Sequence, residues 1–128
     1  MTPQEIVVKK SRFIAYAAGI DSEDKAKEYI ADISHTHKKA RHVVYAYVLP
    51  DTARYSDAGE PPGTAGLPLL SSIQRRNMES VVVVVVRYFG GVLLGKGGLI
   101  RAYGKAAGLA LEDLLTESGS DAHTTKRN

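Results

Sequence analysis

The hydrophobic positions in the first third of the chain change from a strand-like to a helix-like spacing. Loose alternation over residues 6–10 and the β-prone run 13–17 predict one or two strands, and two strands here would form a hairpin. Asp21 and Ser22 are typical of a helix N-cap. Apolar residues then recur at helical spacing: Ala26, Tyr29, Ile30 and Ile33. The pattern predicts a helix that ends near residues 35–37.

The middle of the chain predicts a strand, a long loop and a second helix. Residues 43–49 are β-branched and aromatic, and Pro50 should end this strand. Residues 51–68 are rich in Gly, Pro, Asp and Ser and show no periodicity, which predicts a long ordered loop. A helix should follow over 68–77, with proline in its first turn and Thr64 as a candidate cap upstream.

The last third of the chain carries its strongest patterns. The unbroken valine run 81–86 is typical of a central strand buried on both faces. A glycine-rich turn over 90–98 leads into a helix over 99–115, whereas 116–128 is almost free of apolar residues and should be a flexible tail. The apolar stripe of this helix consists of Leu99, Tyr103, Ala106, Ala110 and Leu114.

These elements predict the fold class. We expect a single α+β domain over residues 1–115, in which a mostly antiparallel sheet carries its helices on one face. Alternate valines of the run 81–86 should face those helices.

Composition narrows the class of protein. At 128 residues the chain can bury a core without disulfides, and it contains no cysteine, which excludes cysteine nucleophiles and zinc–thiolate sites. The longest apolar run, 81–86, is far shorter than the roughly 20 residues that a membrane span needs. No secretory signal opens the chain, so we expect a cytoplasmic protein that is not bound to a membrane.

The charge distribution indicates a polyanion as one class of partner. The net charge is only +3, but between residues 71 and 105 six cations meet one acid, Glu79. Those cations are Arg75, Arg76, Arg87, Lys96, Arg101 and Lys105. A one-sided positive patch attracts phosphate groups. A solvated face with scattered charges explains the same counts, so both interpretations stay open.

The glycine-rich segment resembles a nucleotide-binding P-loop only in part. Residues 90–96 match G-x-x-x-x-G-K, but Gly97 stands where a Ser or Thr hydroxyl would hold magnesium. We therefore expect no nucleotide hydrolysis. Cations beside a helix N-terminus are unfavourable unless an anion binds there. Free backbone N–H groups at the same helix end would donate hydrogen bonds to that anion. The predicted anion or nucleic-acid site comprises Arg87, Gly95, Lys96, Gly97, Gly98, Arg101 and Lys105.

No catalytic or metal-binding set emerges from the spacing. His35, His37 and His42 could suggest a metal site, but the neighbouring lysines and arginine make this region unfavourable for a cation. Asp57 and Glu60 resemble an acid pair, although the Gly and Pro residues around them favour a role in shaping the loop. We therefore predict no catalytic residues, no metal and no cofactor.

Several segments together resemble the IMPACT/YigZ family, formerly an uncharacterised protein family. The resemblance runs from Lys9 to Leu111, so that residues 1–115 correspond to its N-terminal-type domain. It rests on residues 10–13, 40–42, 46–47 and 56–66, and above all on 86–103. The matching loop residues are His42, Asp57, Glu60, Gly63, Thr64 and Gly66. The chain departs from the family at Ala58, Pro62 and Val44, where a second acid, Ser and Cys are common. The first departure counts against a metal or catalytic site in this loop.

The resemblance implies a fold and a field of function. The fold is that of domain IV of elongation factor G and of the second domain of a small-subunit ribosomal protein. Eukaryotic members act in translation control through protein partners, whereas bacterial members are suspected of binding nucleic acid. Bacterial relatives also carry a second, ferredoxin-like domain, so we expect a short or truncated member.

We therefore expect a non-enzymatic domain that binds nucleic acid, most simply RNA, and that is linked to translation or its regulation. One alternative is a protein-interaction module for translation-related partners, for which Tyr55, Tyr88 and Phe89 are candidate anchors. A second alternative is an enzyme that uses the 57–66 loop.

Overall fold

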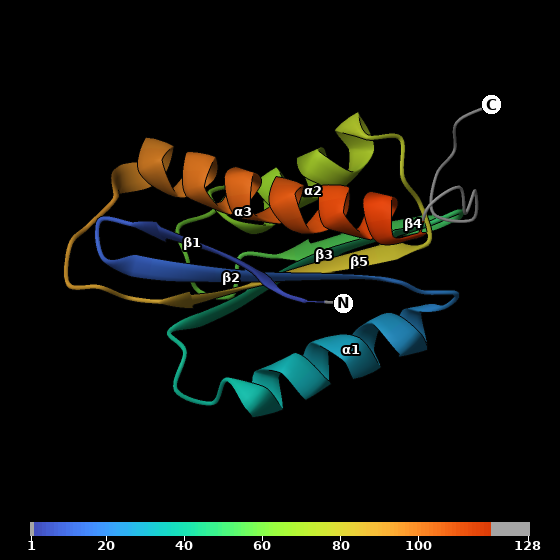
Figure 1. Cartoon of the computed structure of the whole chain (residues 1–128), viewed down its shortest axis with the longest axis horizontal. Coiled ribbons are helices and arrows are strands. Elements are labelled where there is room, and N and C mark those ends of the chain that lie inside the picture. Colours follow the sequence, from blue (N-terminus) through green and yellow to red (C-terminus); the bar gives the residue numbers. More distant parts are fainter. Residues whose placement is uncertain (1, 119–128) are drawn as a thin grey trace.

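A five-stranded antiparallel sheet forms the middle layer of the molecule, with helices above and below it (Figure 1). The computed structural model describes residues 2–118. The strands lie in the order β1-β2-β5-β3-β4. The elements are β1 (Gln4–Val8), β2 (Ser11–Gly19), α1 (Glu23–Thr36), β3 (His42–Leu49), β4 (Thr52–Ser56), α2 (Gly66–Arg75), β5 (Val81–Tyr88) and α3 (Gly95–Ser118).

The valine-rich strand β5 lies at the centre of the sheet, as its sequence predicts. It pairs with β2 on one side and β3 on the other. Val81, Val83 and Val85 point into the core under α2 and α3, and the alternate valines point into a second core under α1. Burial on both faces accounts for the unbroken apolar run.

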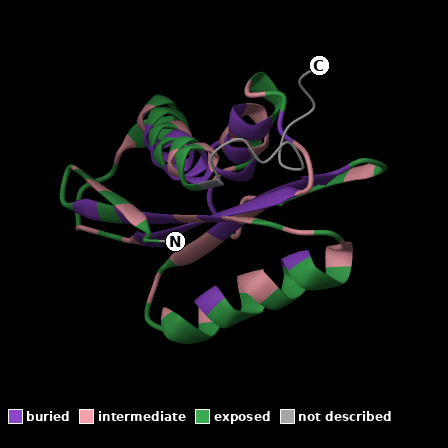
Figure 2. Ribbon diagram, turned by 45° about the vertical axis from the view of Figure 1, so that its right-hand side comes forward, coloured by how far each residue is buried: buried purple, intermediate pink, exposed green. Residues whose placement is uncertain are grey.

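The prediction that all helices pack on one face is wrong. Helices α2 and α3 cover one face of the sheet, and α1 covers the opposite face (Figures 1 and 2). The physical reason is that both faces of β5 are apolar, and Ile14 and Tyr47 extend the second apolar face across the neighbouring strands. The α+β class, the antiparallel sheet and the single domain are confirmed.

The segment 51–68, expected to be one long loop, contains a strand and the start of a helix. Strand β4 pairs with the end of β3, and the first residue pair places Leu49 opposite Thr52. Helix α2 begins at Gly66, and its first N–H groups are capped by Asp57 rather than by Thr64. The Thr64 hydroxyl instead donates to the carbonyl of Pro61 at 2.6 Å.

Helix α3 is longer than its sequence pattern predicts. It begins at Gly95 rather than at residue 99 and continues to Ser118, past the predicted start of the tail at residue 116. The rest of the predicted tail, 119–128, lies outside the described residues. The predicted apolar stripe is buried as expected, while Arg101 and Lys105 lie on the exposed side. Among residues 2–118, no helix combines the length and apolar composition that crossing a bilayer requires.

Candidate functional site

The sheet register brings together three residues that lie far apart in the sequence. Phe13 on β2 and His42 on β3 both lie opposite Arg87 on β5. Side chains alternate along a strand, so Arg87 follows Val81, Val83 and Val85 onto the face under α2 and α3. An arginine therefore enters the edge of an apolar core, and only 5% of it is exposed.

Glu60 neutralises this buried arginine. The guanidinium Nη1 of Arg87 donates to both carboxylate oxygens of Glu60, at 2.8 and 3.1 Å. Glu60 is only 7% exposed and accepts a further hydrogen bond from the hydroxyl of Tyr103 on α3. Burial, and then the hydrogen bond to Glu60, raises the pKa of Tyr103, so that this phenol keeps its proton and remains a donor.

The remaining donors of Arg87 are also engaged. Its Nε and Nη2 lie 3.4 and 3.3 Å from the hydroxyl oxygen of Ser11, which also accepts from the N–H of Gly90 at 3.2 Å. A side chain at Gly90 would place its Cβ 2.1 Å from the carbonyl carbon of Lys10, so only glycine permits this close approach. Arg87, a member of the predicted anion site, is therefore nearly buried and its charge is neutralised by Glu60.

The two acids of the 57–66 loop have different roles. Both Asp57 carboxylate oxygens accept backbone N–H groups, from Gly63 at 3.0 Å, Ala65 at 3.1 Å and Gly66 at 2.8 Å. Asp57 thus shapes the loop and caps α2, whereas Glu60 reaches the buried arginine. Gly66 is required sterically, because a Cβ there would lie 2.6 Å from the carbonyl oxygen of Ser56.

His42 attaches this loop to strand β3. Its Nδ1 lies 2.7 Å from the carbonyl oxygen of Ala58, which can only accept, so Nδ1 carries a proton. Its Nε2 lies 3.5 Å from an oxygen of Glu60. His42 therefore lies near Oε1 of Glu60, whereas Tyr103 donates to Oε2.

A cavity of about 290 Å³ opens above this ion pair. Glu60, Arg87 and His42 form its more buried part, and exposed Arg41 and Lys96 stand at its edge. Its remaining lining is Pro61, Phe89, Leu93, Leu94, Gly95 and Leu99. We call this the α3-start pocket. It combines apolar walls, two exposed cations and the first turn of a long helix.

Two guanidinium groups lie close to the ring of Phe89 at this pocket. The Cζ atom of Arg41 is 4.9 Å from the ring centroid, and that of Arg87 is 5.5 Å from it. Such contacts are favourable because the aromatic face is electron-rich. They hold the exposed Arg41 at the mouth of the pocket.

The structure divides the predicted anion site between two surfaces. Gly95 and Lys96 line the α3-start pocket, whereas Gly98, Arg101 and Lys105 line a smaller depression beside Lys9. Gly97 lies between them, and a Cβ on it would be 3.2 Å from Nη1 of Arg101. The predicted set therefore does not converge on a single point.

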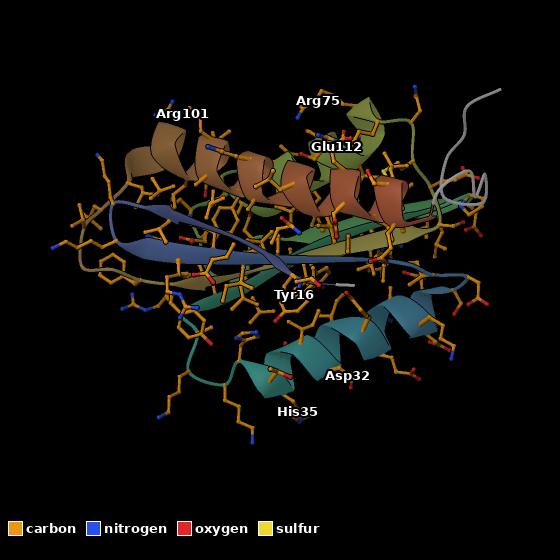
Figure 3. The ribbon with its side chains drawn as sticks, viewed as in Figure 1. Tyr16, Asp32, His35, Arg75, Arg101 and Glu112 are labelled. Carbon is orange, nitrogen blue, oxygen red and sulfur yellow. The ribbon has the colours of Figure 1, made fainter. Side chains whose placement is uncertain are left out.

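The three histidines considered for a metal do not meet. His35 is exposed on α1 (Figure 3), and the ring of His37 bridges the hydroxyls of Tyr16 and Tyr88 at 2.7 and 2.6 Å. Burial, and then the charge of Arg12, lowers the pKa of His37. Within residues 2–118, no group of three or more His, Asp or Glu residues could hold a metal ion.

The sequence patterns assign neither Arg41 and Phe89, which line the pocket, nor Tyr103, which bonds Glu60 beneath it, to a common site. Arg41 entered only as part of a motif, Phe89 only as a protein anchor, and Tyr103 only as part of a core stripe. Of the three aromatic anchor candidates, Tyr55 and Phe89 are exposed, whereas Tyr88 is half-buried and bonded to His37. The strand alternation that continues from Val85 to Arg87 is the signal that could have placed Arg87 beside α3.

Comparison with known proteins places this architecture in a family. The model of the Impact N-terminal domain matches residues 9–111, which include the strands and helices that build the pocket. The chain belongs to this family. It is 43% identical over 113 residues to the IMPACT family member YvyE of Bacillus subtilis, covering 86% of this chain and 52% of that protein. The chain thus spans about half the length of the curated relatives it matches.

Two solved structures share the fold. The crystal structure of a hypothetical protein superposes with a TM-score of 0.85 at 39% identity, covering 88% of this chain and 57% of that one. The two-domain translational regulator Yih1 superposes with a TM-score of 0.55 at 25% identity, covering 91% of this chain and 45% of Yih1. The family resemblance expected from the motifs is confirmed.

Proposed function

We propose that this chain is a non-enzymatic domain that binds single-stranded RNA at the α3-start pocket and serves translation or its regulation. The observation that carries the proposal is the convergence of two exposed cations, Arg41 and Lys96, on an apolar pocket at the start of α3. The link to translation rests on the likeness of this chain to the two-domain translational regulator Yih1.

The charges at the start of α3 favour a bound phosphate. The first turn of α3 contains no acidic residue, and Lys96 lies within it. A cation at this end of a helix is disfavoured by the helix dipole, and the negative charge of a bound phosphate would offset that cost. The phosphate oxygens would also accept hydrogen bonds from the free backbone N–H groups. Glu60 does not repel such an anion strongly, because Arg87 and Tyr103 already neutralise and hydrogen-bond its carboxylate.

The apolar walls of the α3-start pocket can contact the base of a nucleotide whose phosphate is bound by the cations. Phe89 and Leu93 are exposed beside the cations, and the guanidinium of Arg41 offers a planar surface on which a base can stack. These contacts do not read the edges of bases. Binding should therefore be weak, largely independent of sequence and sensitive to salt.

The geometry gives less support to an enzyme built on the 57–66 loop. Asp57 does not line the α3-start pocket, because its oxygens hold three backbone N–H groups. Glu60 and His42 do line it, but the Glu60 oxygens are engaged by Arg87 and Tyr103. Gly97 provides no hydroxyl for magnesium.

Fluorescence anisotropy with a labelled single-stranded RNA tests the proposal. Affinity should fall steeply between about 50 and about 200 mM salt. In the double variant Arg41→Ala/Lys96→Ala, two lost phosphate contacts should reduce the slope of log K against log salt by about 1.4. Lys27→Ala, an exposed cation on the opposite face, is the matched control and should bind like wild type. Equal binding by wild type and the double variant would refute the site.

A further inference from the structure

A second and larger surface feature lies between α2 and α3. A groove of about 880 Å³ runs along the outer side of the two helices, away from the sheet, and Figure 3 shows Arg75, Arg101 and Glu112 along this side. On α3 its lining extends from Ile100 to Glu112, which corresponds to about 18 Å of helix. We call it the α2–α3 groove.

The floor of this groove exposes aliphatic side chains. Leu67 of α2 is 42% exposed, and Ile100 and Leu109 of α3 are 45% and 40% exposed. All three line the groove. Their gathering in one concave surface distinguishes them from apolar residues scattered singly over a protein surface.

Gly104 leaves the middle of the groove open. Glycine weakens a helix interior relative to alanine, so its presence there asks for a reason. At Gly108 a Cβ would be 2.9 Å from Nη2 of Arg76, so the end of that side chain would have to shift. At Gly104 a Cβ would meet no described atom within 4 Å, so the fold itself does not require glycine. A glycine at this point allows the backbone of another molecule to approach closely.

The rim of the groove is positively charged. Arg75, Arg101 and Lys105 are exposed, and within residues 2–118 none of them forms a salt bridge. The fourth cation, Arg76, pairs with Glu112 at 2.8 Å and donates to the carbonyl of Ser72 at 3.0 Å. The charge that the groove offers to a partner is therefore cationic.

We propose that the α2–α3 groove docks an acidic amphipathic α-helix of a partner protein. The apolar face of that helix packs on Leu67, Ile100 and Leu109, a small residue of it approaches Gly104, and carboxylates on its flanks meet the cationic rim. The groove is long enough for about three turns of helix. Aliphatic side chains and an open glycine suit a packed helix better than nucleobases, which stack on aromatic rings. The inference does not depend on RNA binding at the α3-start pocket.

The experiment is a selection from a phage-displayed library of amphipathic helices about five turns long, randomised at the polar positions. Binders enriched by the wild-type domain should carry Asp and Glu beside their apolar stripe. A synthetic peptide of the strongest binder, labelled with a fluorophore, then measures affinity by anisotropy. A peptide of the same composition in scrambled order is its control.

Gly104→Leu is the decisive variant, because it adds a bulky side chain to the groove at a position where the Cβ would meet nothing within 4 Å. Its thermal midpoint should be no lower than that of wild type, since leucine favours helix more than glycine does. Its peptide affinity should fall more than tenfold. Arg75→Glu, at the rim, should also weaken the peptide, whereas Arg41→Ala/Lys96→Ala should bind it like wild type.

The outcomes distinguish this inference from the RNA proposal. Gly104→Leu should lose the peptide and keep RNA, and the Arg41→Ala/Lys96→Ala variant should do the reverse. The docking inference is overturned if no helical binder is enriched, if enriched binders are basic, or if Gly104→Leu binds the peptide as well as wild type. It is also overturned if Gly104→Leu loses RNA but not the peptide, because the groove would then belong to a nucleic-acid surface.

Discussion

Replacing one residue of the Glu60–Arg87 ion pair should lower the free energy of unfolding by more than the loss of that side chain's packing alone. In Arg87→Met the Glu60 carboxylate, only 4% exposed as a side chain, loses its guanidinium partner and keeps the hydrogen bond from Tyr103, with Nε2 of His42 3.5 Å away. Leaving one buried charge unpaired costs about 3–5 kcal/mol. Small domains are typically stable by about 5–15 kcal/mol, so this variant should unfold much more readily than wild type.

The double variant separates the pair interaction from the loss of packing. Glu60→Gln removes the carboxylate charge at nearly constant volume but leaves an amide oxygen that can still accept from Arg87, so it should cost less than Arg87→Met, about 1.5–3 kcal/mol. Combined with Arg87→Met it should cost less than the sum of the two single changes, by about 1–3 kcal/mol, because the second change removes the charge that the first left unpaired.

Urea denaturation followed by circular dichroism measures all four proteins of this cycle. Arg12→Met is a suitable control, because it breaks an exposed pair with Glu5, whose side chains are 50% and 40% exposed, and should cost less than about 1 kcal/mol. If the costs of the two single changes simply add in the double variant, Glu60 and Arg87 do not interact as described.

Three further predictions test other parts of the structure. The lowered pKa of His37 means that the unfolded chain binds its proton more readily, so this residue's contribution to stability is lost as pH falls below its usual pKa of 6.5. The urea midpoint of wild type should therefore drop more between about pH 7.5 and about pH 5 than that of His37→Gln, and equal drops would contradict this. Asp57→Ala should cost about 1–2 kcal/mol in urea denaturation through the lost cap of α2, whereas Asp51→Ala in the β3–β4 turn should change stability by less than about 0.5 kcal/mol. ATP or GTP hydrolysis, measured as released phosphate, should not exceed background, and activity that Lys96→Ala abolishes would count against the binding-only proposal.

The sequence predicts the elements that carry strong periodicity. Two predicted elements lie where expected: the strand of run 81–86 and the apolar stripe from Leu99 to Leu114. A strand buried on both faces gives an unbroken apolar run, and a helix buried on one face gives apolar residues at helical spacing. Strand β4 lacks such a pattern: it lies at the sheet edge, is largely exposed and is defined by its pairing with β3. The first turn of α3 is rich in glycine, which has a low helix propensity, so the sequence does not predict a helix there. Tertiary packing overrides this low propensity.

The candidate site depends on contacts that periodicity does not encode. Alternation along β5 places Arg87 on the α3 face, but pairing with Glu60 depends on the path of the 57–66 loop. The same loop path turns Asp57 away from the pocket and toward α2. Lys96 and Arg101 line different depressions because of where α3 begins. The glycine pattern did not predict that starting point.

Nuclear magnetic resonance can locate bound RNA on the surface of the domain and so tests binding at the α3-start pocket. The ¹⁵N-labelled domain would be titrated at low salt with a single-stranded RNA of about eight nucleotides. If RNA binds there, the backbone amide signals of Phe89, Gly95, Lys96 and Gly97 should shift progressively and return toward their free positions when salt is raised, while those of α1 stay unchanged. No shift at low salt, or shifts centred on α1, would contradict it.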